Sequence, residues 1–337
     1  MKNLLFLLSV LLVSVSFGQT AEEYFNLGNA KYNLEDYKGA IGDYTKAIKL
    51  DPAFSNAHYN RGLAKFELQD YKGAMTDFNK AIELNPTDAD TYYKRGLAKN
   101  NLEDYKGSVA DFNKAIEIDP AYIDAYNNRG NAKMFLEDYI GSIADYTKAI
   151  ELDPTDINGY YNRGFVNVAY LENYKGAIAD YNKVIEFYPT DINSYNNRGL
   201  AKDELKDYNG AIADFNKAIE LDPTNANSYY NRGKAKANLK DFKGAIEDYT
   251  KAIELDPTFA FAYDSRGKAK NDLKDYKAAI TDFNKSIKLD PTYAAAYYNR
   301  GNAKYYSSDT DGACLDWSKA VELGHAEAYE LIKKYCK

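Results

Sequence analysis

The side chains best placed for chemistry in this 337-residue chain are eight arginines that recur every 34 residues, with one step of 35. Nine aspartates recur in the same rhythm. A guanidinium group binds carboxylates and other anions, so the pattern predicts either a line of structural ion pairs or a basic track for an anionic ligand. We favour the ion pairs, because an acidic residue accompanies the arginines at fixed spacing.

The 34-residue period divides the chain into repeats, and each arginine is predicted to pair with the aspartate of the preceding repeat. Leu27 takes the arginine's place in the first repeat, which alone has no predecessor. Asp316 has no arginine after it, and we expect Lys334 to serve it. Lysines four residues after most of the arginines are expected to border this line. The predicted pairs are Arg61–Asp43, Arg95–Asp77, Arg129–Asp111, Arg163–Asp145, Arg198–Asp180, Arg232–Asp214, Arg266–Asp248 and Arg300–Asp282.

Asparagine and aromatic residues recur just before the arginine position. Asparagine directly precedes it in seven of nine repeats, with Lys94 and Ser265 as exceptions, and the asparagines are Asn26, Asn60, Asn128, Asn162, Asn197, Asn231 and Asn299. One residue earlier stand the rings of Phe25, Tyr59, Tyr93, Tyr161, Tyr230 and Tyr298. Asparagine is a mediocre helix former, yet its carboxamide can both donate to and accept from a peptide backbone. These residues therefore predict a peptide-binding surface, with tyrosine supplying contact area.

Two alternatives use the same residues. They could brace neighbouring helices, since duplication of a repeat copies every residue, whether it binds a partner or not. They could also bind a glycan or a small polar ligand. A purely structural spacer would need no ligand at all.

The internal period sets the elements that must position these residues. With Ala21 as position 1, nine repeats start at residues 21, 55, 89, 123, 157, 192, 226, 260 and 294, and the extra residue lies near Tyr170. Apolar residues at helical spacing predict two helices in each repeat. In residues 226–259, Asp241 is the expected N-cap of the second helix and Pro257 follows its end. Gly233 and Ala245 are small where the two helices approach closely.

This pattern resembles the tetratricopeptide repeat (TPR). The family motif W-x2-L-G-x2-Y, A-x3-F, P corresponds here to Tyr229-x2-Arg232-Gly233-x2-Lys236, then Ala245-x3-Tyr249, then Pro257. Arginine in the leucine position and lysine in the tyrosine position are departures from it. The ending Lys319-Ala320-Val321-Glu322-Leu323-Gly324 is similar to Sel1-like repeats.

The resemblance implies an all-α fold: a right-handed superhelix of nine helix-turn-helix repeats over residues 19–327, closed by a capping helix and tail at 328–337. It places the asparagines and tyrosines on the concave face. The asparagine row is similar to that of the O-GlcNAc transferase superhelix, which holds peptide backbones. The lysine–asparagine pattern of the chaperone-binding carboxylate clamp does not occur in three successive repeats.

Cys314 and Cys336 are the two cysteines of the chain. They begin and end helices expected to run antiparallel, so a disulfide is predicted, with two buried thiols as the alternative. His58 and His325 are far apart and are interpreted as structural. No phosphate-binding loop or calcium loop is complete, so neither catalysis, a cofactor nor a metal is expected.

Residues 1–18 read as a secretory signal peptide, with the basic start Met1-Lys2-Asn3, the apolar run 4–15 and small residues before Gln19. The residue directly after the expected cleavage site is not cysteine, so we expect no lipid anchor there, and no later stretch is long and apolar enough to predict a membrane span. Without Lys2 the chain has 42 basic and 50 acidic residues, which argues against a nucleic-acid partner. The sequence thus predicts an exported, periplasmic or extracellular scaffold that binds a protein or an extended peptide.

Overall fold

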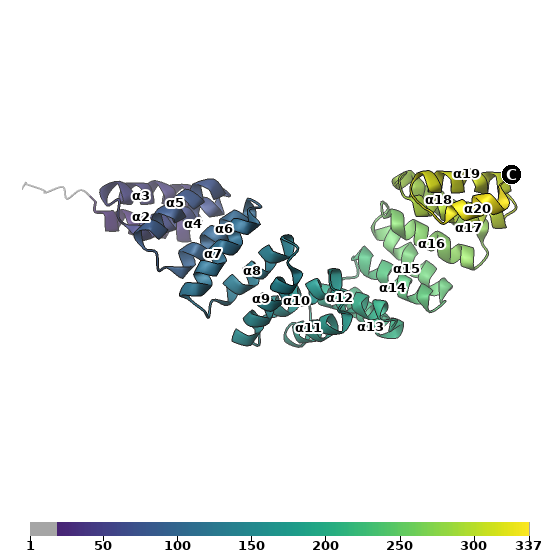
Figure 1. The fold of residues 1–337 in the computed structure, drawn as a ribbon, viewed down its shortest axis with the longest axis horizontal. Helices are drawn as coiled ribbons and strands as arrows, with labels where there is room; N and C mark the ends of the chain where they lie inside the picture. Colours follow the sequence, from purple (N-terminus) through teal and green to yellow (C-terminus); the bar gives the residue numbers. More distant parts are fainter. Residues whose placement is uncertain (1–18, 337) are drawn as a thin grey trace, which may run out of the picture. The chain divides into compact units, whose positions relative to one another are not determined.

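The computed structural model describes residues 19–336, and the predicted signal peptide lies outside them. Within that range every regular element is a helix, α2 to α20, and no strand occurs (Figure 1). The helices form nine antiparallel pairs followed by a last single helix. This is the all-α helix-turn-helix repeat architecture that the sequence predicts. Over the same residues, no helix has the length and apolarity to span a membrane.

The first helix of each pair begins at the residue taken from the sequence as the start of a repeat. The first helices are α2 (Ala21–Asn33), α4 (Ser55–Glu67), α6 (Ala89–Asn101), α8 (Ile123–Phe135), α10 (Ile157–Ala169), α12 (Ile192–Glu204), α14 (Ala226–Asn238), α16 (Ala260–Asp272) and α18 (Ala294–Tyr306). The second helices are α3 (Tyr37–Leu50), α5 (Tyr71–Leu84), α7 (Tyr105–Ile118), α9 (Tyr139–Leu152), α11 (Tyr174–Phe187), α13 (Tyr208–Leu221), α15 (Phe242–Leu255), α17 (Tyr276–Leu289) and α19 (Thr310–Glu322).

A short turn joins the two helices of each repeat. Its last residue caps the second helix: Asp241 Oδ1, for example, accepts a hydrogen bond of 3.0 Å from the backbone nitrogen of Gly244. The residue before the cap has a positive φ in every repeat, although it is never glycine, as in Lys240 with φ 64°. The turn of the fifth repeat is one residue longer, at 170–173, which locates the extra residue of the sequence.

Close packing of each pair depends on one glycine. A Cβ atom on Gly62 of α4 would lie 2.7 Å from the ring of Phe78 on α5, so a larger residue would push the ring out of the core. Ala74 and Ala81 of α5 are fully buried beside that ring. The small positions noted in the sequence are therefore the places where the two helices meet.

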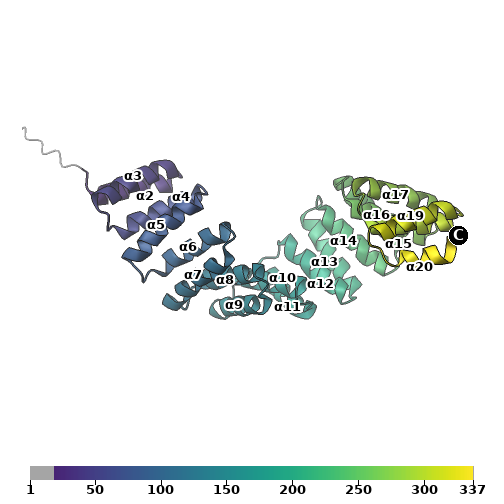
Figure 2. The same ribbon diagram turned by 45° about the horizontal axis from the view of Figure 1, so that its top comes forward.

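The chain divides into two compact units, residues 1–159 and 160–337. Within each unit the repeats stack in chain order, and consecutive first helices touch, as α4 touches α6 and α14 touches α16 (Figures 1 and 2). Among residues 19–336, no second helix makes a comparable contact with the next second helix. The first helices therefore line the inner face of each unit, and the second helices lie outside.

Helix α20 (Ala328–Tyr335) packs on α19 and covers the last repeat. Its Tyr335 ring lies 4.5 Å from that of Tyr305 and 6.1 Å from that of Trp317, between ring centroids. A disulfide joins Cys314 of α19 to Cys336, with 5.8 Å between the Cα atoms. These are the two cysteines paired in the sequence analysis, and the bond ties the capping helix to the repeat beneath it.

Candidate functional site

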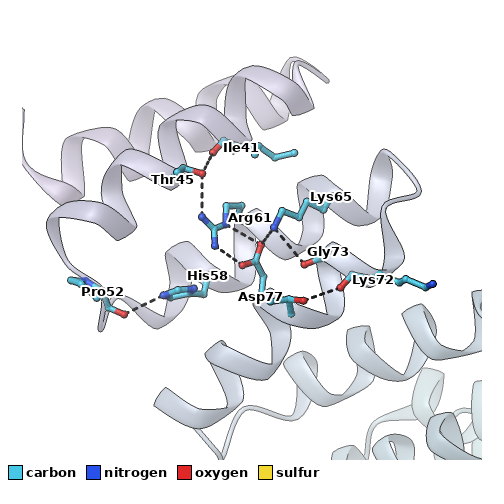
Figure 3. Close-up of polar contacts among 10 residues, drawn as sticks. Ile41, Thr45, Pro52, His58, Arg61, Lys65, Lys72, Gly73 and Asp77 are labelled. Atoms are coloured by element: carbon cyan, nitrogen blue, oxygen red, sulfur yellow. Dashed lines mark hydrogen bonds and ion pairs between the residues drawn. The ribbon is translucent and has the colours of Figure 1, made fainter.

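The recurring arginine lies in a buried polar network, drawn for the second repeat in Figure 3. Arg61 Nε and Nη2 donate to the two oxygens of Asp77 at 2.9 and 2.6 Å. Lys65 Nζ lies 2.7 Å from Asp77 Oδ2, and Arg61 Nη1 donates to Thr45 Oγ1 at 3.1 Å. Asp77 is almost completely buried, so these two cations offset the cost of removing its charge from water.

The arginine–aspartate pair recurs in each repeat from the second to the ninth. The distance from arginine Nη2 to aspartate Oδ1 is 2.5 to 2.7 Å throughout. From the third repeat on, the guanidinium carbon also lies over the tyrosine ring three residues earlier, for example 5.4 Å from the centroid of Tyr229 in the case of Arg232. The paired residues are Arg61–Asp77, Arg95–Asp111, Arg129–Asp145, Arg163–Asp180, Arg198–Asp214, Arg232–Asp248, Arg266–Asp282 and Arg300–Asp316.

The predicted choice of partner was therefore wrong. Each arginine binds the aspartate of its own repeat, because the two helices of one hairpin bring these positions face to face. In seven of the eight repeats the contact with the preceding repeat is made instead by Nη1, which donates to an asparagine or threonine on the preceding second helix, as Arg232 does to Asn216 at 2.7 Å. Lys334 does not serve Asp316, which binds Arg300 and Lys304.

The pairings that the structure corrects are those of Asp43 with Arg61, Asp77 with Arg95, Asp111 with Arg129, Asp145 with Arg163, Asp180 with Arg198, Asp214 with Arg232, Asp248 with Arg266 and Asp282 with Arg300. Leu27 is still explained, since the first repeat has no preceding second helix to receive Nη1. Its Asp43 binds Lys31 and Lys46 at 2.5 and 3.0 Å. Because the arginine heads are occupied between second helices, they form no basic track on the inner face.

The fifth repeat has one cation fewer in this network. Asn167 stands where the other repeats have lysine, so Asp180 has Arg163 as its one close cation among the described residues. Burial raises the pKa of Asp180 above its ordinary value, against the opposing effects of Arg163 and Asn167. In the first repeat burial also opposes the charge, but hydrogen bonds from Lys31 and Lys46 lower the pKa of Asp43.

The predicted asparagine row lies on the inner face, and four of its members already have partners. Asn60 donates to Asn29 at 2.7 Å, Asn128 to Tyr93 at 3.1 Å, Asn197 to Tyr161 at 3.3 Å and Asn299 to Asp264 at 2.9 Å. Each bond joins one first helix to the preceding one. These four thus brace the inner face, whereas Asn26 is exposed, Asn162 and Asn231 are half-buried, and none of the three bonds a described side chain.

The aromatic row is also packed into the fold. Tyr59 donates its hydroxyl hydrogen to Asp90 of the next repeat, and Tyr93 is 8% exposed. The ring of Tyr230 lies 5.8 Å from that of Tyr249, and Tyr298 stacks on His325 at 4.3 Å. These rings contribute mainly edges and hydroxyl oxygens to the inner face, so its free chemistry must come from other positions.

A hollow of about 350 Å³ opens on the inner face between α14 and α16. The sequence analysis did not single out its charged residues. Lys234 and Lys268 are the two lysines at position 9 of any repeat, and Asp264 is the one aspartate at position 5, where six repeats have an aromatic residue. In the sequence these residues differ from those at the same positions of the other repeats. A prediction based on residue types that the repeats share does not identify them.

The two histidines contact nearby residues rather than each other. His58 Nε2 lies 3.1 Å from the carbonyl oxygen of Pro52 (Figure 3), and His325 stacks on Tyr298. In residues 19–336 no three histidine, cysteine or acidic side chains are grouped so as to hold a metal ion.

Stacked helical hairpins with a lined inner face define an α-solenoid repeat protein. The family model described as TPR repeat matches residues 28–69, 62–102, 100–134, 204–240 and 267–308, and that described as tetratricopeptide repeat matches 123–156 and 226–259. The chain belongs to the tetratricopeptide repeat family, whose fold serves as a protein-interaction scaffold. No curated protein matches the chain.

Several solved structures are similar to this one. The repeat protein YrrB, described as having an unusual peptide-binding site, is 27% identical over 55% of this chain and 95% of its own, with a TM-score of 0.50. A tetratricopeptide repeat protein from Parabacteroides merdae is 19% identical over 74% of this chain and 99% of its own, at 0.60. The C-terminal part of one from Cytophaga hutchinsonii is 23% identical over 72% and 98%, at 0.59. The last two share the fold.

A double-mutant cycle tests the pairing within a repeat. Replacing Arg232 by methionine leaves the carboxylate of Asp248 buried with one cation, so the free energy of unfolding should fall by about 3 kcal/mol. Combined with Asp248→Asn the two effects should be far from additive, whereas with Asp214→Asn they should add. Urea unfolding provides the measurement. Lys251→Ala, which removes an exposed pair with Glu254, should cost less than about 0.5 kcal/mol. Coupling of Arg232 to Asp214 instead of Asp248 would reject the assignment.

Replacing Asn167 by lysine should complete the network of the fifth repeat. The added cation lowers the pKa of Asp180 and should raise the free energy of unfolding by about 1.5 kcal/mol at pH 7. The gain requires the charged carboxylate, so it should disappear as the pH falls through the raised pKa of Asp180. Unfolding curves of both proteins between neutral and acidic pH measure it. Asn209→Lys adds the same charge at an exposed position of α13 and serves as the control. An equal gain in the free energy of unfolding for that variant would attribute the effect to net charge.

Proposed function

We propose that this protein is a non-catalytic scaffold that holds an extended segment of a partner protein along the inner face of its repeats. The observation that carries the proposal is the inner face itself. First helices line it side by side, and it carries amide groups without partners together with a hollow of ligand size.

The spacing of the first helices suits an extended chain. Packed helices lie about 8–10 Å apart, and an extended chain advances about 3.3 Å per residue, so a bound segment would pass one helix every three residues or so. In each unit a carboxamide that bonds no described side chain, Asn26 in the first and Asn231 in the second, offers both a donor and an acceptor to the backbone of a segment bound there. The peptide-binding site printed for YrrB, at 27% identity, supports the same use of the fold.

The binding test starts from random twelve-residue peptides displayed on phage and selected on residues 19–337. A selected peptide, synthesised and titrated by calorimetry, should lose about three- to tenfold in affinity when Asn231 is replaced by alanine, which is the loss expected for one hydrogen bond. Asn209→Ala, on the outer helix α13, should bind like the unaltered protein. Both variants should keep the same thermal midpoint.

Two results would overturn the proposal. One is the failure of selection to yield any peptide whose affinity depends on Asn231 or Asn26. The other is binding of oligosaccharides on a glycan array by a protein that binds no peptide, because that would assign the same inner face to glycans.

We further propose that the chain is exported and works in the periplasm or outside the cell. Residues 1–18 have the pattern of a secretory leader, and the Cys314–Cys336 bond suits an oxidising compartment. Intact mass spectrometry of the protein from its native cells, without reductant, should give a chain that begins at Gln19 and weighs two hydrogens less than its dithiol form. A chain that begins at Met1, with both thiols free, would reject export.

A further inference from the structure

Three side chains that line the hollow between α14 and α16 are smaller than their counterparts in most other repeats. Asp264 stands at position 5, where six repeats have a tyrosine or phenylalanine, and Ser265 follows it, where seven repeats have asparagine. Ala237 of α14 takes position 12, which holds rings or longer side chains in every other repeat. The hollow has a volume of about 350 Å³. It is large enough for one side chain of a bound segment.

The base of the hollow carries a buried carboxyl group without a counter-ion. Asp264 is 3% exposed and accepts a hydrogen bond of 2.9 Å from Asn299 Nδ2. No ammonium or guanidinium group of the described residues lies within ion-pair distance of it, although Lys268 is on the next turn of α16. Burial raises the pKa of Asp264, and the opposing effects of Asn299, Lys268 and Tyr293 are smaller. A cation brought into the hollow would offset the cost of burying this carboxylate.

The walls favour a cation as well. The rings of Tyr230, Phe242, Tyr249 and Tyr293 line the hollow, and aromatic faces attract positive charge. Burial, and next the charge of Asp264, raise the pKa of Tyr293, so its hydroxyl stays neutral and able to donate.

Two lysines and two aspartates line the hollow. Lys234 lies 3.1 Å from Asp203 and 3.6 Å from Glu204, so its charge is already met. Asp272 on the rim has no ion-pair partner among the described residues. Asp264 and Asp272 are therefore the two lining carboxylates without an ion pair, whereas Lys234, one of the two lining lysines, is already paired.

We propose that this hollow binds the cationic side chain of a lysine or arginine, with the charge against Asp264 and the stem between the tyrosine rings. The inference deepens the proposed function, since that side chain would belong to the bound segment. The α14–α16 hollow would then be the site where the scaffold distinguishes one segment from another. The proposed asparagine contacts are made to the backbone and do not depend on the side chains of the segment.

Single-residue probes test the hollow apart from any longer peptide. Nα-acetyl-lysine N-methylamide, titrated into the ¹⁵N-labelled protein of residues 19–337, should shift the amide signals of Ser265 and Lys268 to saturation. The norleucine and glutamate analogues should not. Asp264→Asn should weaken binding of the lysine probe at least tenfold, and Asp264→Tyr, which restores the repeat residue and fills the space, should abolish it.

Two further variants sharpen the test. Glu247→Gln removes one exposed charge from α15 and should leave binding unchanged, which controls for net charge. Lys268→Met removes the nearest competing cation and should tighten binding of the lysine probe. Equal binding of lysine and norleucine probes, stronger binding of the glutamate probe, or wild-type affinity in Asp264→Asn would each overturn the inference.

The outcomes also separate this inference from the proposed function. If the lysine probe binds in a way that depends on Asp264 but no peptide is selected, the cation site in the hollow is supported and the bound segment is rejected. If selected peptides bind the Asp264→Asn variant with the same affinity as the unaltered protein, the scaffold function is supported and the cation site in the hollow is rejected.

Discussion

One buried carboxylate per repeat organises this structure. This aspartate of the second helix is nearly inaccessible to water. Its charge is tolerable because cations meet it at hydrogen-bond distance: an arginine in the second to ninth repeats, joined by a lysine of the first helix in all but the fifth, and two lysines in the first repeat. The same arginine reaches an amide or hydroxyl on the preceding second helix. A single polar network therefore fixes the angle within a hairpin and the stacking of one hairpin on the next.

This network separates stability from binding. Its cations lie toward the second helices, so the inner face carries few obligatory charges and its side chains can differ between repeats. The inner row is braced by amide and phenol groups in most repeats, as in Asn128 with Tyr93. The hollow on α14 and α16 is lined by Asp264 and Ser265, which replace the ring and the asparagine found in most repeats. Specificity in such a scaffold follows from exceptions to its repeat.

Much of the architecture could be predicted from the sequence, because each helix boundary has a local cause. Asp241 caps a helix and Pro257 follows the end of the same helix, and both effects depend on neighbouring backbone atoms. The partner of each arginine could not be predicted in this way. Arg61 has one aspartate 18 residues before it and another 16 residues after it, and the rotation of the packed helices decides between them. The inner hollow was missed because it depends on how Asp264 and Ala237 differ from their counterparts.

The fifth repeat has a consequence for how such an array comes apart. The stability of a stacked repeat protein is approximately the sum of the stabilities of its repeats and of the interfaces between neighbours. Cooperative unfolding is interrupted where one of these contributions is weak. The fifth repeat combines an inserted turn residue with a network that lacks its lysine, so Asp180 is held by fewer charges than its eight counterparts. Hydrogen exchange and limited proteolysis are expected to begin at such weak positions. Fragments that end there would keep whole hairpins on either side, each with its own ion pairs intact.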